Sequence, residues 1–424
     1  MIVLHQGPKR MNRHEPVTVN ERTYSWPEAP LVVVCIDGSQ PEYIEQAVQA
    51  GHMPFLSKAL ENGADLRADC IVPSFTNPNN LSIVTGCPPS VHGISGNFFL
   101  DPDSGEAVMM NDPKFLRTGT ILQAFHQAGA SLVILTAKDK LRKLLGHGID
   151  YRSGGAICFS SECADQTTMA ENGIDNADQF VGLPIPDVYS AELSEFIFAA
   201  GVKLMERDRP DIMYLSTTDY IQHKHAPGAP VANRFYAMMD RYLGKLDSMG
   251  AVLALTADHG MNDKYDVNGK PDVLYLQDVL DSKLGPTRAR VILPITDPYV
   301  VHHGALGSFA TVYLPDDCDA DDVAQDLRAM VGIMDVYTNA RGCEVFELPQ
   351  DRLGDLIIVS DRHKVLGTRA ESHDLSQLKE PLRSHGGITE QVVPLIVTRP
   401  VEGLSEGKRL RNFDIFDVAL NYTL

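Results

Sequence analysis

Three acidic residues stand directly after apolar segments of the sequence. Asp37 ends VVVCID, Asp219 ends MYLSTTD and Asp258 ends LALTAD. Each segment has the length and composition of a buried strand, and ligands of open α/β sheets gather at the carboxyl ends of the strands. A single aspartate at such a place is usually a helix cap or a loop residue. Three aspartates at equivalent strand ends are poorly explained as three separate caps and indicate a shared site.

Histidines accompany these aspartates. His223 follows Asp219 by four residues in DYIQH, a spacing that puts both side chains on one face of a helical turn. His259 is adjacent to Asp258, and His385 lies in the glycine-rich stretch LRSHGGIT. A lone histidine is more often structural, but carboxylate and imidazole together are ligands of Zn²⁺ and similar divalent ions. The sequence therefore predicts a divalent metal site.

Thr76 lies in VPSFTNPNNLSIVTG, a turn-forming stretch before an expected helix. Thr76 could be only a helix cap, because a threonine hydroxyl is a weak nucleophile unless a base or a metal activates it. Two metal ions about 4 Å apart would activate it and clamp an in-line displacement at phosphorus. We predict that Thr76 is the nucleophile and that Asn79 donates its amide to a phosphoryl oxygen. We also expect His225 to contact the ligand.

The segments that position these residues alternate between apolar runs and helical patterns. We expect buried strands at 31–37, 131–136, 211–219, 251–260, 355–360 and 392–398, and helices at 41–63, 120–129 and 232–250. This order predicts an α/β fold with a mostly parallel central sheet and helices on both faces. Residues 266–349 break the rhythm and are expected to form a smaller inserted α+β cap domain. The catalytic core is then 30–265 with 350–424, and 1–29 is an N-terminal extension.

The composition excludes several classes of partner. Lys plus Arg number 37 and Asp plus Glu 56, so the net charge of the 424 residues is −19, which disfavours binding of nucleic acid or an anionic membrane. A metal site can still reverse the local field for a small anion. The apolar runs are only as long as strands and are too short to span a membrane. The first thirty residues lack the apolar core of a signal peptide. The seven cysteines show no CxxC pairing, which argues against a disulfide framework. We expect a soluble cytoplasmic enzyme and leave a homodimer open.

The order of the motifs resembles that of the alkaline phosphatase superfamily, most closely its branch of nucleotide pyrophosphatases/phosphodiesterases. The motifs are CIDGS, PSFTNPNNLSIVTG with VHGISGN, TTDYIQH, TADHGM and SHGG, and they span residues 37 to 387. The resemblance implies an alkaline-phosphatase-like core and two Zn²⁺ ions, with Thr76 as the nucleophile near both. It implies one zinc site of Asp37, Thr76, Asp258 and His259, and another of Asp219, His223 and His385.

Within this superfamily the likeness is greatest to the hydrolases that cleave the carbon–phosphorus bond of phosphonoacetate. VTVNERTYSWPEAPLVVVCIDGS, TNPNNLSIVTGCPPSVHGISGNFFLD and LTAKDKLRKLLG carry it. It implies that Lys138 and Lys140 hold the substrate, although KDKLRKLL alone is also typical of a solvated basic helix start. It further implies that attack by Thr76 gives a phosphothreonine and acetate, and that phosphate is then released.

A nucleotide phosphodiesterase or pyrophosphatase with the same two zinc ions is the main alternative. It needs an aromatic or apolar slot for a base, and aromatic residues are 7% of the chain, although Tyr and Phe could still form the slot. A sulfatase of this fold would normally carry a cysteine- or serine-derived nucleophile where Thr76 stands. A binding protein without activity would have lost a ligand residue, yet all seven expected ligands are present.

Overall fold

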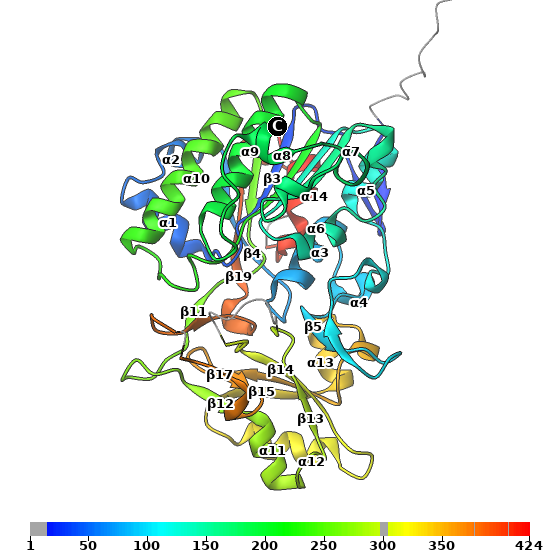
Figure 1. Cartoon of the computed structure of the whole chain (residues 1–424), viewed down its shortest axis with the longest axis vertical. Helices are drawn as coiled ribbons and strands as arrows, with labels where there is room; N and C mark the ends of the chain where they lie inside the picture. The colour runs from blue at the N-terminus through cyan, green and yellow to red at the C-terminus, as the bar shows by residue number, and fades with distance from the viewer. Residues whose placement is uncertain (1–14, 297–303, 377, 406) are drawn as a thin grey trace, which may run out of the picture.

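A seven-stranded sheet forms the framework of the computed structural model, which describes residues 15–296, 304–376, 378–405 and 407–424 (Figure 1). Its strand order is β4 (Ala64–Asp69), β19 (Val392–Val397), β10 (Val252–Thr256), β3 (Leu31–Cys35), β9 (Ile212–Ser216), β7 (Leu132–Thr136) and β8 (Ala156–Ser160). The pairs from β10 to β8 are all parallel, whereas β19 is antiparallel to both β10 and β4. The predicted mostly parallel α/β sheet is confirmed.

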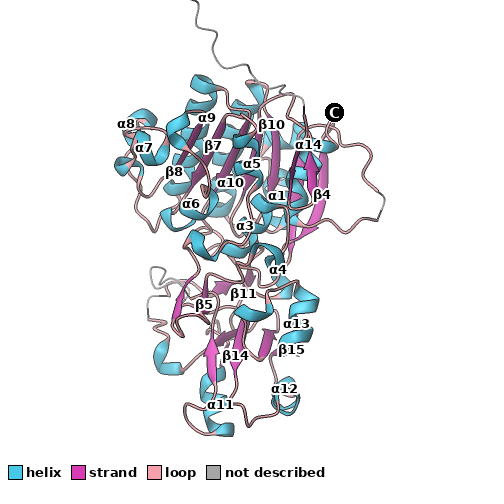
Figure 2. Ribbon diagram, turned by 90° about the vertical axis from the view of Figure 1, so that its right-hand side faces the viewer, coloured by secondary structure: helices cyan, strands magenta, loops and turns pink. Residues whose placement is uncertain are grey.

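Helices cover both faces of this sheet (Figure 2). In β3, Val32 and Val34 belong to one hydrophobic cluster and Leu31, Val33 and Cys35 to another, because successive side chains point to opposite faces. The strand is therefore apolar throughout. The first face carries α1 (Pro41–Gln49), α2 (Pro54–Ala59), α9 (Glu192–Asp208) and α10 (Pro230–Ser248). The second carries α3 (Thr76–Thr85), α5 (Ile121–Gln127), α6 (Asp139–Leu145) and α14 (Ile415–Asn421).

A smaller lobe lies beyond one edge of the main sheet and has a hydrophobic core of its own (Figures 1 and 2). Its antiparallel sheet has the order β13 (Arg290–Ile292), β14 (Phe309–Tyr313), β16 (Leu356–Ser360) and β15 (Ile333–Thr338). The helices α11 (Leu276–Leu284), α12 (Ala320–Arg328) and α13 (Asn339–Phe346) pack against it. The predicted division into a core and an inserted cap domain stays a proposal, and part of it falls on residues 1–14 and 297–303, outside the described residues.

Short elements complete the two lobes. Four two-stranded pairs are β1 (Val17–Val19) with β2 (Arg22–Tyr24), β5 (Phe98–Leu100) with β6 (Ala107–Met109), β11 (Asn262–Asp263) with β18 (Arg383–Ser384), and β12 (Val273–Tyr275) with β17 (Val365–Gly367). The short helices are α4 (Pro89–His92), α7 (Met169–Asn172) and α8 (Ala177–Val181). Among the described residues, no helix is both long and apolar enough to cross a membrane.

Four details differ from the sequence prediction. The strand expected to return to the main sheet, β16, pairs with β14 and β15 in the smaller lobe. β19 is antiparallel rather than parallel, because no crossover helix precedes it and the chain enters the sheet from the opposite edge. The helix expected over 41–63 is two helices, and Pro54 begins the second. The sequence prediction also omits β4, whose alternating ADLRAD lacks an apolar run, and β8.

Candidate active site

The predicted site residues meet at one edge of the main sheet. Asp37, Asp219 and Asp258 follow the parallel strands β3, β9 and β10, and the chain that leaves β4 reaches Thr76. Because parallel strands end at the same edge, these segments converge there. β19 runs the other way and therefore begins at this edge, which places His385 of the loop before it beside the aspartates. The reversed strand is thus needed to complete the site.

Asp37, Asp258 and His259 form the first group that could hold a metal ion, with ligand atoms that all lie within 4.8 Å of one another. His259 Nε2 and Asp37 Oδ1 are 3.2 Å apart, yet both are buried without a hydrogen-bond partner. Asp258 Oδ1 accepts the N–H groups of Gly38 at 3.2 Å and His259 at 3.0 Å, and Oδ2 accepts Asn80 Nδ2 at 3.2 Å. Unpaired buried polar atoms that converge on one point suit a cation.

Asp219, His223 and His385 form the second group, and its ligand atoms also lie within 4.8 Å of one another. The N–H of His223 donates to the carbonyl of Asp219 at 3.0 Å, which closes the single turn predicted from DYIQH. This turn places His223 Nε2 2.8 Å from Asp219 Oδ2. His385 stacks on His259 with ring centroids 3.6 Å apart, so the two groups are direct neighbours.

The hydrogen bonds of the three histidines define their tautomers. In each ring Nδ1 contacts a backbone carbonyl oxygen, which can only accept a hydrogen bond, so Nδ1 carries the proton. The acceptors for His223, His259 and His385 are the carbonyls of Arg383, Gly260 and Ser74, at 2.8, 2.9 and 2.7 Å respectively. This leaves each Nε2 lone pair for a metal ion, which is the usual arrangement around metal-bound histidines. The residues therefore fit two metal ions.

The electrostatics of the site also favour cations. Burial, followed by the charges of Asp219 and Asp258, raises the pKa of Asp37 well above its ordinary value. Burial opposes ionisation of Asp219 as well, but His223, His385 and Lys138 hold its pKa well below its usual range. Three buried aspartates this close together are costly to ionise, and divalent ions would offset their mutual repulsion.

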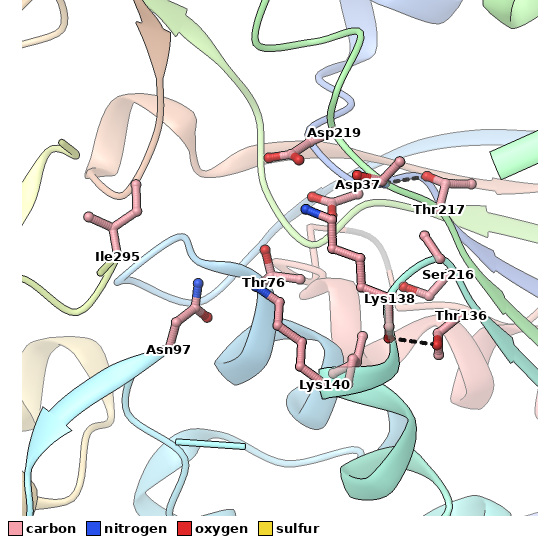
Figure 3. Close-up of a pocket in the computed structure, with 13 residues that line it drawn as sticks. Asp37, Thr76, Asn97, Thr136, Lys138, Lys140, Ser216, Thr217, Asp219 and Ile295 are labelled. Atoms are coloured by element: carbon pink, nitrogen blue, oxygen red, sulfur yellow. Dashed lines mark hydrogen bonds between the residues drawn. The ribbon is translucent and has the colours of Figure 1, made fainter. Parts of the chain in front are cut away.

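Thr76 is the first residue of α3 and lines a cavity of about 40 Å³ (Figure 3). Every later residue of this ten-residue helix is buried, which fixes the position of its N-terminus. Asn80 links Thr76 to the first metal group, because its Nδ2 lies 3.1 Å from the Thr76 carbonyl and 3.2 Å from Asp258 Oδ2. Thr76 thus lies beside Asp37 and Asp219, as the sequence predicts.

Both predicted lysines line the same cavity. Lys138 follows β7 and Lys140 lies in the first turn of α6. Figure 3 shows the amino groups of Lys138 and Lys140 directed toward Asp37 and Thr76. The cavity is lined by Asp37, Thr76, Asn97, Thr136, Ala137, Lys138, Lys140, Leu141, Ser216, Thr217, Thr218, Asp219 and Ile295.

Asn79 and His225 are not among these cavity-lining residues. Asn79 is buried, its Oδ1 accepts the N–H of Ile71 at 2.8 Å, and its Nδ2 faces the carbonyls of Ile71, Pro73 and Phe75 at 3.4, 3.3 and 3.1 Å. These contacts tie the Asn79 amide to the backbone turn before α3, and its phosphoryl contact stays a prediction. His225 offers its backbone carbonyl to the Tyr43 hydroxyl at 2.6 Å, outside the cavity.

Asn97 is a cavity residue that the sequence reasoning missed. Its Oδ1 accepts the N–H of Asn77 at 2.9 Å, a bond that satisfies one N-terminal donor of α3 and orients the amide at the cavity wall. Asn97 belongs to VHGISGN, a motif in which the sequence assigns no role to this residue. No spacing rule identifies it, because it reaches the site through the fold of the loop between α4 and β5.

Comparisons with known proteins identify relatives of this chain. A model of the type I phosphodiesterase / nucleotide pyrophosphatase family matches residues 31–388. Two crystal structures of phosphonoacetate hydrolase from Sinorhizobium meliloti 1021, in complex with phosphonoformate and with phosphonoacetate, are 58% identical and superpose with TM-scores of 0.94 and 0.93. Each alignment covers 96% of this chain and 99% of that one. The superposition confirms the expected alkaline-phosphatase-like fold.

Relatives found by sequence add two further observations. Phosphonoacetate hydrolase from Penicillium oxalicum is 51% identical over 49 residues, 11% of this chain and 68% of that sequence. Ectonucleotide pyrophosphatase/phosphodiesterase 1 of Saccharomyces cerevisiae is 24% identical over 338 residues, which is 72% of this chain but 42% of that protein. Across three ectonucleotide relatives found by sequence, the matched region is 10%, 21% and 42% of the relative's own length. The chain therefore belongs to the type I phosphodiesterase / nucleotide pyrophosphatase family and, within it, to the phosphonoacetate hydrolases.

Proposed function

We propose that the protein hydrolyses the carbon–phosphorus bond of phosphonoacetate to acetate and phosphate with two Zn²⁺ ions. The observation that carries this proposal is a small cavity lined by Thr76, by Lys138 and Lys140, and by one aspartate of each metal group, Asp37 and Asp219. The 58% identical hydrolase was crystallised with phosphonoacetate, which supports the same substrate here. The proposed ligands are Asp37, Thr76, Asp258 and His259 for one ion, and Asp219, His223 and His385 for the other.

The zinc ions would supply positive charge to activate the Thr76 hydroxyl and to stabilise the phosphoryl oxygens. The other contributions come from the chain. The Thr76 side chain stands at the N-terminus of α3, where backbone N–H groups and the helix dipole favour a negatively charged phosphono group. Asn97 is a second candidate for the role predicted for Asn79, because its amide lies at the cavity wall beside Thr76. We propose that this amide donates to a phosphoryl oxygen.

In the first step the Thr76 hydroxyl releases its proton to solvent, its oxygen forms a bond to phosphorus, and the carbon–phosphorus bond breaks. The electron pair of that bond passes to the methylene carbon and is delocalised into the carboxylate as an enolate-like dianion. Lys138 and Lys140 would stabilise this charge through their amino groups, and the carbon then takes a proton to give acetate. In the second step water attacks phosphorus and releases a proton, the Thr76–phosphorus bond breaks, the Thr76 oxygen takes up a proton, and phosphate is released.

The cavity favours a small substrate over a nucleotide. Its volume is about 40 Å³, so it suits a compact ligand. Among the described residues that line it, none is aromatic, and a nucleotide base would need an aromatic or apolar slot. The charges also match, because two lysines and two divalent ions would face a substrate that carries a phosphono group and a carboxylate.

A phosphate-release assay with two substrates tests this proposal. Zinc-loaded protein is incubated in parallel with phosphonoacetate and with a nitrophenyl phosphodiester, and phosphate and nitrophenol are measured over time. We expect phosphate from phosphonoacetate at a rate well above that of diester cleavage. Cleavage of the diester alone would assign the site to phosphodiesters instead.

A further inference from the structure

The smaller lobe contributes one described residue to the lining of the cavity, Ile295 (Figure 3). Its side chain is 1% exposed and belongs to the hydrophobic core of that lobe. Ile295 follows β13 in a turn in which the N–H of Thr296 donates to the carbonyl of Leu293 at 2.9 Å. An apolar residue of one lobe therefore lies at the wall of a cavity whose other lining residues belong mainly to the other lobe.

Contacts on both sides hold this turn in place. The carbonyl of Pro294 accepts the N–H groups of Asn97 at 2.9 Å and Phe98 at 3.1 Å, which ties the turn to the loop that carries a cavity residue. A Cβ atom at Gly96 would lie 2.6 Å from Pro294 Cβ, so the two segments already touch. On the other side, a Cβ atom at Gly307 would lie 3.0 Å from Ile295 Cδ1. These contacts leave little free space into which the Ile295 side chain could shift when a larger ligand binds.

The chemistry of the proposed substrate indicates which of its atoms can face such a residue. In the proposed function the phosphono group contacts Thr76 and the metal groups, and the carboxylate contacts the lysines. Both charged ends therefore face polar residues. Only the methylene carbon between them can lie against an apolar side chain without losing a polar contact. A substituent on that carbon would compete for space with the closely packed Ile295.

We propose that Ile295 is a specificity-determining residue that excludes phosphonocarboxylates with a substituent on the carbon between phosphorus and the carboxylate. The inference rests on the proposed function, and it adds that the protein selects the unbranched member of this substrate class by steric exclusion. 2-Phosphonopropionate is the matching probe, because its extra methyl group leaves both charged ends and the electron-accepting carboxylate unchanged. One extra methylene group against an apolar pocket wall typically changes selectivity by about 10- to 200-fold.

Binding measurements in the zinc-loaded Thr76→Ala protein test this proposal without turnover. Dissociation constants for phosphonoacetate and 2-phosphonopropionate are measured by calorimetry with isoleucine, valine or alanine at position 295. The measured quantity is the ratio of the dissociation constant for 2-phosphonopropionate to that for phosphonoacetate. We expect Ile295→Ala to lower this ratio by about tenfold or more, and Ile295→Val to lower it by less. Leu141→Ala, on the wall that carries the lysines, is the matched control for general enlargement of the cavity and should leave the ratio unchanged.

The outcomes separate this proposal from the proposed function. An unchanged ratio in both position-295 variants, or an equal change in Leu141→Ala, would overturn the role of Ile295. If Ile295→Ala does not fold, as judged by circular dichroism, the milder Ile295→Val decides the matter. Failure of the unsubstituted protein to cleave phosphonoacetate would refute the proposed function alone, because the binding ratio does not depend on turnover.

Discussion

Ser74 joins the nucleophile turn to the loop that carries His385, and its replacement should weaken the second metal group. Its carbonyl accepts the Nδ1–H of His385 at 2.7 Å. Its hydroxyl oxygen accepts the N–H of Gly386 at 2.9 Å and donates to the carbonyl of Gly387 at 3.0 Å. Ser74→Ala keeps the carbonyl but removes both hydroxyl contacts. The loop that positions His385 would then lose two of the hydrogen bonds that hold it to the turn before α3.

The expected magnitude follows from burial. Ser74 is fully buried, so the change leaves one N–H and one carbonyl group without their partner, each at a cost of about 1–2 kcal/mol. We expect the free energy of unfolding of the metal-free protein to fall by about 2–4 kcal/mol. Loss of such a supporting contact typically weakens metal binding by about 10- to 100-fold, and we expect this for one of two bound Zn²⁺ ions.

Two assays measure these effects separately. Urea unfolding of the metal-free protein gives the loss of stability, and zinc titration against a chromogenic chelator gives both zinc affinities. Ser82→Ala is the matched control, because Ser82 is equally buried and its hydroxyl contacts His92 Nε2 at 2.9 Å, away from the metal groups. The control should lose stability but bind zinc normally. Normal zinc affinity in Ser74→Ala would show that Ser74 supports the fold without positioning His385.

Three further predictions concern catalysis and acid stability. Thr76→Ala should abolish phosphate release from phosphonoacetate while most zinc stays bound, as measured by atomic absorption. Near-normal turnover by this variant would mean that another group attacks phosphorus. Lys138→Ala and Lys140→Ala should raise KM for phosphonoacetate far more than for a diester without a carboxylate, and equal effects on both substrates would contradict carboxylate binding. Burial, followed by the charge of Arg352, lowers the pKa of His92 from 6.5 to about 3. Between these values only the unfolded chain takes up the proton, so stability falls as the pH falls, by about 2 kcal/mol at pH 5. His92→Gln should remove this loss, and an unchanged pH profile of urea midpoints would refute it.

The sequence predicts the metal groups because their residues follow strands. An uninterrupted apolar run predicts a buried parallel strand, and parallel strands end at the same edge of the sheet. The sequence alone therefore places Asp37, Asp219 and Asp258 at that edge. His223 was predictable from its spacing to Asp219, since one turn of chain sets that distance. These are local relations, and the structure reproduces each of them.

Other parts of the site depend on contacts between distant segments and were not predictable in this way. The sequence indicates Asn79 and gives Asn97 no role, and only the packing around α3 ties the Asn79 amide to backbone carbonyls and brings Asn97 to the cavity. Ile295 belongs to a lobe whose position relative to the main sheet no periodic pattern encodes. The antiparallel direction of β19 likewise follows from the route of the chain rather than from its apolar residues.

Proton and phosphorus NMR of one reaction in D₂O tests the central claim most directly. Zinc-loaded protein and its Thr76→Ala variant are each incubated with phosphonoacetate, and substrate, phosphate and acetate are quantified together. The proposed chemistry predicts that phosphate and acetate appear in equal amounts, that the acetate carries one deuterium where the carbon–phosphorus bond was, and that the variant forms neither product. Phosphonoacetate that stays intact with the unsubstituted protein, or is cleaved equally by the variant, would contradict it.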